Sequence, residues 1–187
     1  MEKLIKRLIK EVKSGDTEAF GELVEMYKDK VYQLSYRMLG NMHEAQDVAQ
    51  EAFLRAYTNI DRYDTNRKFS TWLFRIATNL AIDRLRKRKP DFHLEDPIKG
   101  TEGMTVQSQI ASTEELPDDQ VVKVEMQEWI QDEINHLPPK YRSAIILKYI
   151  EDLSLKEISE ILDLPVSTVK TRIHRGRETL RKRMGNV

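Results

Sequence analysis

Apolar residues recur at helical spacing through most of this chain. In the first clear stretch they lie three, four or seven residues apart, at Phe20, Leu23, Val24, Tyr27, Val31, Leu34 and Met38. No alternating pattern long enough for a strand is found. The sequence therefore predicts an all-α protein.

Residues that cap helices divide the N-terminal half into three helices. Asp16 is expected to cap the first, and Gly40 to end it. Asn41 with Glu44 three residues later resembles a capping box for the second, and Ser70 is expected to cap the third. Three helices with apolar stripes can bury those stripes against one another in one small domain.

A segment at residues 90–118 interrupts this helical pattern with three prolines and two glycines. Residues 90–120 carry eight acidic side chains against one lysine, a net charge of −7, whereas residues 1–89 and 140–187 are each at +5. We expect two small helical domains, 1–89 and 119–187, joined by a flexible acidic linker. A merely solubilising spacer is the alternative.

Aromatic and basic residues gather on the predicted third helix and the polar loop before it. Four of the chain's 14 aromatic residues fall within 12 positions, at Tyr63, Phe69, Trp72 and Phe74. The outer face of the helix carries Arg75, Asn79 and Arg86. Exposed rings beside cationic groups suit single-stranded nucleic acid, because bases stack on the rings while the cations hold phosphates. Burial of each ring in the core is the competing interpretation.

The C-terminal half has helix-turn-helix spacing at about residues 154–177. Ser154 with Glu157 predicts a capping box for a short helix, a three-residue turn includes Asp163, and Ser167 is expected to cap a second helix. The outward residues of that helix are polar and basic, as in a helix that reads the major groove. A helical hairpin with a solvated basic face is the alternative.

Other function classes find little support. The chain has no Cys, and its four His, at positions 43, 93, 136 and 174, have no ligand spacing, so we expect neither a metal site nor a catalytic site, and no cofactor. The first 13 residues carry charges throughout and no run approaches the length of a membrane span. We therefore expect a soluble cytoplasmic protein.

Three segments together resemble the extracytoplasmic-function (group IV) sigma factors of bacterial RNA polymerase, most closely the sigma-W type associated with cell-envelope stress. They are DVAQEAFLRAYTNIDRYD (47–64), FSTWLFRIATNLAIDRLRKRK (69–89) and YRSAIILKYIEDLSLKEISEILDLPVSTVKTRIHRGRETLRKR (141–183). The resemblance implies a sigma region 2 bundle, a sigma region 4 helix-turn-helix, and a role in promoter-specific initiation of transcription, without enzymatic activity.

The resemblance also implies roles for particular residues. Binding to the clamp helices of the largest catalytic subunit of core polymerase falls to Asp47, Gln50, Glu51 and Leu54. Recognition and melting of the −10 element, with capture of a flipped base, falls to Tyr63, Asn66, Phe69, Trp72, Arg75, Asn79 and Arg86. Reading of the −35 element as duplex falls to Ser167, Thr168, Lys170, Thr171, Arg172 and Arg175. A solvated outer face is the alternative for the acidic helix.

Further partners follow from the same resemblance. The polymerase flap region is a second contact, the acidic linker threads toward the active centre, and a membrane-anchored anti-sigma factor holds the protein inactive until its release to the nucleoid. Two other functions compete from the residues alone. A two-domain repressor would share the helix-turn-helix, and a helical adaptor would give no sequence-specific protection of DNA.

Overall fold

The structure, a computed structural model, describes residues 1–88 and 118–185, and the side chains of all of these except residues 118–125. All regular structure in these residues is helical, which confirms the all-α prediction. The predicted linker lies outside the described residues except for its last position. Among the helices described, none has the length and apolar character needed to cross a membrane.

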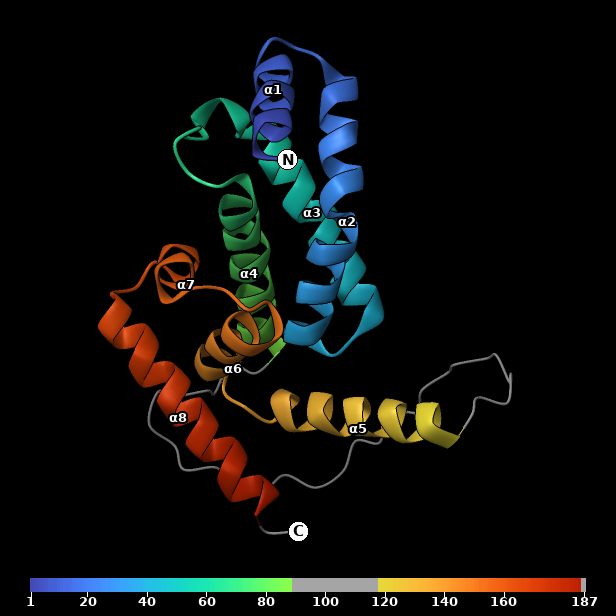
Figure 1. The fold of residues 1–187 in the computed structure, drawn as a ribbon, viewed down its shortest axis with the longest axis vertical. Coiled ribbons are helices and arrows are strands. Elements are labelled where there is room, and N and C mark those ends of the chain that lie inside the picture. Colours follow the sequence, from blue (N-terminus) through green and yellow to red (C-terminus); the bar gives the residue numbers. More distant parts are fainter. Residues whose placement is uncertain (89–117, 186–187) are drawn as a thin grey trace.

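Four helices and one short turn form the N-terminal half: α1 (Glu2–Lys13), α2 (Thr17–Leu39), α3 (Met42–Thr58), the 3-10 turn η1 (Ile60–Arg62) and α4 (Phe69–Arg88). Helices α2, α3 and α4 pack against one another, and α1 lies against α2 (Figure 1). Their shared core includes Leu23, Leu34 and Leu73, none of which is measurably exposed.

Helix α1 was not predicted. Its apolar residues Leu8, Ile9 and Val12 are buried, with Ile5 partly buried beside them, and basic residues cover the outer side. This spacing of three and four residues is the helical signal that the charges of the first 13 residues obscured.

The capping residues act largely as predicted. The Asp16 carboxylate accepts two backbone N–H bonds of the first turn of α2, at 2.9 and 3.2 Å. Gly40 ends that helix with a φ of 65°, a left-handed conformation that favours glycine. The Asn41 side chain accepts the N–H of Glu44 at 3.0 Å. Ser70 differs from prediction, because α4 begins one residue earlier, at Phe69.

The C-terminal half consists of α5 (Asp118–Asn135), α6 (Pro139–Ile145), the π-helical turn η2 (Ile146–Ile150), α7 (Leu155–Leu162) and α8 (Val166–Met184). Helix α6 packs against α8, α7 lies beside α4, and α5 projects away from the body (Figure 1). The two halves are therefore in contact.

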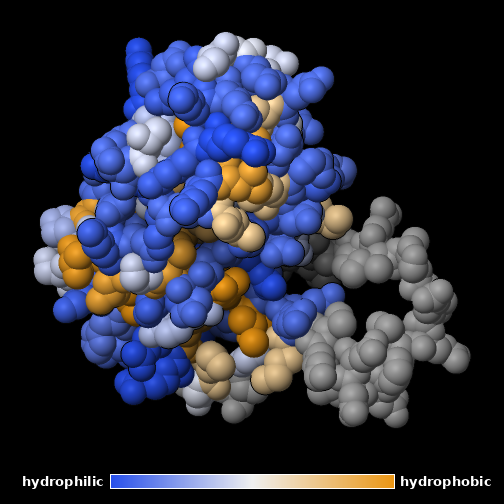
Figure 2. All heavy atoms as spheres, turned by 45° about the horizontal axis from the view of Figure 1, so that its top comes forward, coloured by the Kyte–Doolittle hydropathy of each residue, from blue (hydrophilic) through white to orange (hydrophobic). Residues whose placement is uncertain are grey.

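The surface is mainly hydrophilic, with apolar side chains reaching it in several places (Figure 2). One such group lies on α5, where Met126, Trp129 and Ile130 are 58%, 36% and 40% exposed. Their exposure leaves apolar area available to a partner.

Gly176 allows α8 to approach α6 closely. A Cβ built on Gly176 would lie 2.7 Å from Cγ1 and 3.0 Å from Cδ1 of Ile145, which is itself buried. A Cβ built on Gly21 of α2 would have no neighbour within 4 Å. Alanine at Gly21 therefore serves as a control for alanine at Gly176, because only the second residue lies against another helix.

We predict that Gly176→Ala lowers the thermal unfolding temperature while Gly21→Ala raises it. Both changes gain about 1 kcal/mol of helix propensity, but only the first forces overlap in the core, which costs about 1 to 3 kcal/mol. Thermal unfolding followed by circular dichroism measures both. Equal stabilisation by the two variants would show that the α6–α8 contact yields without cost.

Candidate nucleic-acid interface

The outer face of α4 carries polar residues, as predicted, but part of it is turned toward α7. Asn79 and Arg86 are exposed, whereas Trp72 and Arg75 are half-buried. The Arg75 guanidinium lies 3.2 Å from the Asp163 carboxylate and donates to a backbone carbonyl of α7 at 3.3 Å. In this arrangement two N–H donors of Arg75 are engaged by the helix-turn-helix, so a phosphate would compete with those contacts.

The prediction of exposed rings is wrong for three of the four clustered aromatics. Tyr63, Phe69 and Phe74 are 4%, 2% and 5% exposed, and the ring of Tyr63 meets those of Phe69 and Trp72 with centroids 5.7 and 4.9 Å apart. Burial, aided by the nearby charge of Asp64, raises the pKa of Tyr63 to about 12. These rings form a core beneath the loop, and only the partly exposed Trp72 is placed to stack on a base.

The loop at residues 61–68 has a defined backbone. The Asp64 carboxylate accepts the N–H of Asn66 at 2.9 Å, and the Asp64 carbonyl accepts the N–H of Arg67 at 3.0 Å. The Tyr63 hydroxyl donates to the carbonyl of Arg67. Asn66, a predicted site residue, is exposed on this ordered turn.

The loop ends at Lys68, which reaches the second half of the chain. Its ammonium lies 2.7 Å from the Glu157 carboxylate at the start of α7. Glu157 also accepts bonds from the N–H and hydroxyl of Ser154, at 3.0 and 2.7 Å, which completes the predicted capping box. The bond from Lys68, followed by those from Ser154, lowers the pKa of Glu157 to about 2.

The predicted helix-turn-helix is present at α7 and α8. Asp163 takes the left-handed conformation, with φ 56° and ψ 49°, and ends α7. The prediction that Ser167 caps α8 is wrong, since that helix begins at Val166 and the residue before it is Pro165. Pro165 is in extended backbone that leads into the helix without a side-chain cap.

The residues predicted to read duplex DNA lie on the first three turns of α8. Ser167, Lys170, Thr171 and Arg175 are exposed, and Thr168 and Arg172 are half-buried. Burial lowers the pKa of Arg172, and the charge of Arg86 on α4 lowers it further. The cationic groups of the two predicted DNA-binding helices therefore lie near each other.

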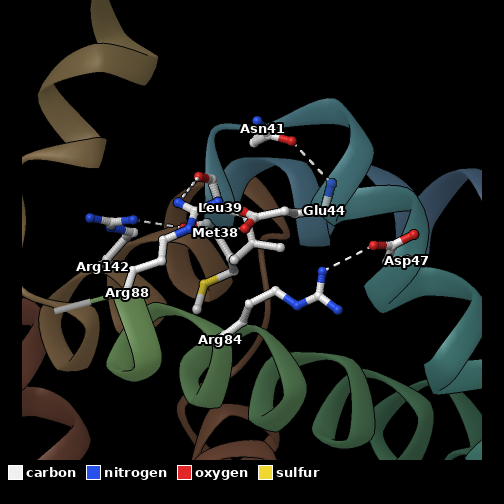
Figure 3. Close-up of polar contacts among 8 residues, drawn as sticks. All are labelled: Met38, Leu39, Asn41, Glu44, Asp47, Arg84, Arg88 and Arg142. Carbon is white, nitrogen blue, oxygen red and sulfur yellow. Dashed lines mark hydrogen bonds and ion pairs between the residues drawn. The ribbon is translucent and has the colours of Figure 1, made fainter. Parts of the chain in front are cut away.

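A groove between α3 and α4 contains the four residues predicted to bind polymerase. Asp47, Gln50, Glu51 and Leu54 line it together with basic residues of α4. Asp47 pairs with Arg84 at 3.2 Å (Figure 3), and Glu51 pairs along its own helix at 2.7 Å. Leu54 is 58% exposed at the edge. The groove offers apolar groups, of which Leu54 is the most exposed, and several charged groups to a partner.

Comparison with known proteins identifies the family. The family model of sigma-70 region 2 matches residues 23–90, and that of sigma-70 region 4 matches residues 127–180. The whole chain is 63% identical to the ECF RNA polymerase sigma factor SigW of Bacillus subtilis (strain 168), over 100% of both proteins. The chain is an extracytoplasmic-function RNA polymerase sigma factor.

Other relatives agree with this assignment. The ECF RNA polymerase sigma-E factor of Escherichia coli (strain K12) is 36% identical over 92% of this chain and 90% of the relative. The structure of CnrH in complex with the cytosolic domain of CnrY has the same fold, with a TM-score of 0.70 and 24% identity over 98% of each chain. Sigma factors are initiation factors rather than enzymes, which confirms the prediction that the protein is not an enzyme.

The two halves of the sigma factor meet at the C-terminus of α2. Arg142 of α6 is 7% exposed and donates to the Met38 carbonyl at 2.8 Å, while Arg88 of α4 donates to the Leu39 carbonyl at 3.1 Å. Figure 3 shows both guanidinium groups turned toward this part of the chain. Gln131 of α5 donates to the Arg37 carbonyl at 3.0 Å.

Arg142 is held by carbonyl oxygens of both halves. It also donates to the carbonyls of Asn135, the last residue of α5, and of Leu137, two residues later. Burial, with the charge of Arg88, lowers the pKa of Arg142 to about 10, so the side chain stays charged at neutral pH. The negative ends of α2 and α5 stabilise that charge.

Sequence reasoning missed this contact. The sequence did contain a signal for it: Arg142 is a charged residue beside Ala144 and Ile145, which were expected to face inward. Glu44 was expected to bond back toward Asn41, but its carboxylate instead pairs with Arg88.

We predict that Gln131→Ala shifts the free protein toward separated halves. The variant loses two bonds with Arg37, one in each direction at 3.0 Å, and each such bond stabilises by about 0.5 to 1.5 kcal/mol. Because the chain has no Cys, dyes can be placed at Glu22→Cys and Arg177→Cys, both exposed, and read by single-molecule energy transfer. Gln127→Ala, one turn earlier and exposed, is the control.

A larger low-transfer population in Gln131→Ala than in Gln127→Ala is the expected result. Identical transfer histograms for the two variants would mean that these bonds do not hold the halves together.

Proposed function

We propose that this sigma factor binds core RNA polymerase and reads promoters with two domains, residues 1–89 and 119–187. The helices α3 and α4 bind the clamp helices, the loop at 61–68 with α4 opens and holds the −10 element, and α8 reads the −35 element. The observation that carries this is the full-length identity of 63% to a named ECF sigma factor, joined to the ordered loop and the exposed face of α8.

The roles of individual residues are part of this proposal. Asn66, Asn79 and Arg86 are exposed and in place to touch unpaired bases or phosphates. Tyr63 and Phe69 act from beneath, as the core that supports Trp72 and the loop. Because Arg75 is paired with Asp163, its use on DNA competes with that ion pair and so favours separation of the two halves.

Regulation and place of action are also proposals. We expect a membrane-anchored anti-sigma factor to hold this cytoplasmic protein at the membrane until a cell-envelope signal releases it to the nucleoid. The solved structure of the sigma factor RpoE with the anti-sigma factor NepR from Bartonella quintana shares the fold, with a TM-score of 0.63 and 20% identity. The exposed apolar group on α5 is where we expect the polymerase flap region to bind.

Transcription in a purified system tests the proposal. Core polymerase is given genomic fragments with and without this protein, and the start sites of the transcripts are mapped. New start sites preceded by shared −10 and −35 sequences are expected. A repressor would remove start sites, and a helical adaptor would leave them unchanged.

We predict that Leu54→Arg weakens binding to core polymerase about tenfold, since it replaces an exposed apolar side chain of the groove, which a partner would bury, with a charged one. Met42→Arg is the matched control, because Met42 lies on the same helix, is also 58% exposed and is outside the groove. Fluorescence anisotropy of labelled protein titrated with core polymerase gives both affinities. Equal affinities would remove the groove from the polymerase interface.

We predict that Arg175→Ala weakens binding of holoenzyme to promoter DNA by about 1 to 3 kcal/mol if Arg175 contacts a base. That loss disappears on a promoter in which the contacted base pair is replaced. Lys182→Ala, exposed near the end of α8, should instead act equally on all sequences and lower the salt dependence. An Arg175→Ala loss that is the same for every −35 sequence would assign this residue to a phosphate.

A further inference from the structure

The side chain of Lys13 links the end of α1 to the loop predicted to hold an unpaired base. Its ammonium donates to the Tyr63 carbonyl at 2.9 Å and to the Asp61 carbonyl at 3.4 Å. These contacts join residues 48 to 50 positions apart in sequence. Figure 1 shows α1 beside the chain that leads from α3 into this loop.

Tyr63 is the residue through which this link reaches the rest of the loop. Its ring is buried against Phe69 and Trp72, its carbonyl is bound by Lys13, and its hydroxyl donates to the carbonyl of Arg67. The position of Tyr63 is thus set from three directions. Tyr63 in turn fixes the turn around Asn66, because its hydroxyl bonds the carbonyl of Arg67 at the end of that turn.

The exposed side chains of the loop depend on that backbone. Residues 61, 62 and 64–68 are exposed, and Asn66 lies at the turn closed by Asp64. A loop that is ordered before binding loses less conformational entropy when it captures a base, and it also presents its polar groups in one geometry. Loosening the loop would therefore reduce discrimination between bases as well as affinity.

We propose that Lys13 is a positioning residue for base recognition: it fixes the carbonyls of Asp61 and Tyr63, and through them the loop, without itself touching DNA. The proposal rests on the proposed function of this loop in reading the −10 element. The competing role for Lys13 is a general cationic one, shared with the other basic residues of α1. Lys10, three residues before Lys13 on the same helix, is exposed and can serve only in this general cationic role.

The test compares Lys13→Met with Lys10→Met in the full chain bound to core polymerase. Each variant removes one positive charge and keeps a long apolar stem. The probes are single-stranded DNA of the non-template −10 sequence and the same DNA with the flipped base replaced by each other base. The ratio of the affinity for the cognate strand to that for each replaced strand measures base discrimination. A change in charge that weakens binding to every strand equally leaves this ratio unchanged.

Lys13→Met is expected to lower affinity for the cognate strand by about three- to tenfold and to reduce the discrimination ratio, because one charged hydrogen-bond donor is lost from the loop. Lys10→Met should lower the affinity for every strand by the same small factor. Lys13→Arg, which keeps a cationic donor, should retain most of the ratio. Hydrogen exchange of the amides of Asn66 and Arg67 should be faster in Lys13→Met alone.

The proposal is overturned if Lys13→Met leaves both the ratio and the exchange rates as they are in Lys10→Met, since Lys13 would then act only by its charge. Asn66→Ala separates this failure from that of the proposed function. If Asn66→Ala reduces discrimination and Lys13→Met does not, only the positioning role fails. If the wild-type protein does not discriminate at the flipped base, the loop does not read DNA and both fail.

Discussion

The arrangement of this protein depends on the C-terminus of α2. The last four carbonyls of a helix have no partner within it, and they carry the negative end of the helix dipole. Here each of the four finds a donor, from the N–H of Gly40 and from the side chains of Gln131, Arg142 and Arg88. Two of these donors belong to the C-terminal half, so satisfying the end of one helix also joins the two halves.

This junction places the helix-turn-helix over part of α4. The ion pairs of Arg75 with Asp163 and of Lys68 with Glu157 both join α7 and the turn after it to the N-terminal half, and one partner in each pair is largely solvent-exposed. Such pairs contribute little each, about 0 to 1 kcal/mol, so they favour the contact without preventing its release. The nearby charges of Arg86 and Arg172 oppose the contact.

Local signals in the sequence were sufficient for most of the fold. Asp16, Gly40, Asn41 and Ser154 act on the backbone within four residues of themselves, so their helix ends could be predicted without any tertiary contact. The four residues predicted to bind polymerase, Asp47, Gln50, Glu51 and Leu54, share a face for the same reason, since helical spacing alone places them together.

What the sequence did not reveal depends on contacts across the fold. A cluster of rings has the same composition whether it stacks on bases or packs inside, and the burial of Tyr63 and Phe69 is decided by Tyr27 and Trp72 around them. The carbonyl partners of Arg142 and Lys13 lie up to 104 and 50 residues away, and backbone acceptors have no residue signature.

The central claim is that the two halves are docked through the end of α2 in the free protein and separate when promoter DNA is bound. Spin labels at Gln33 of α2 and His174 of α8, both exposed, would report the distance between the halves by pulsed electron resonance. A single narrow distribution for the free protein, replaced by a longer one with core polymerase and promoter, is the predicted result. A broad distribution for the free protein, or no change on adding both partners, would contradict it.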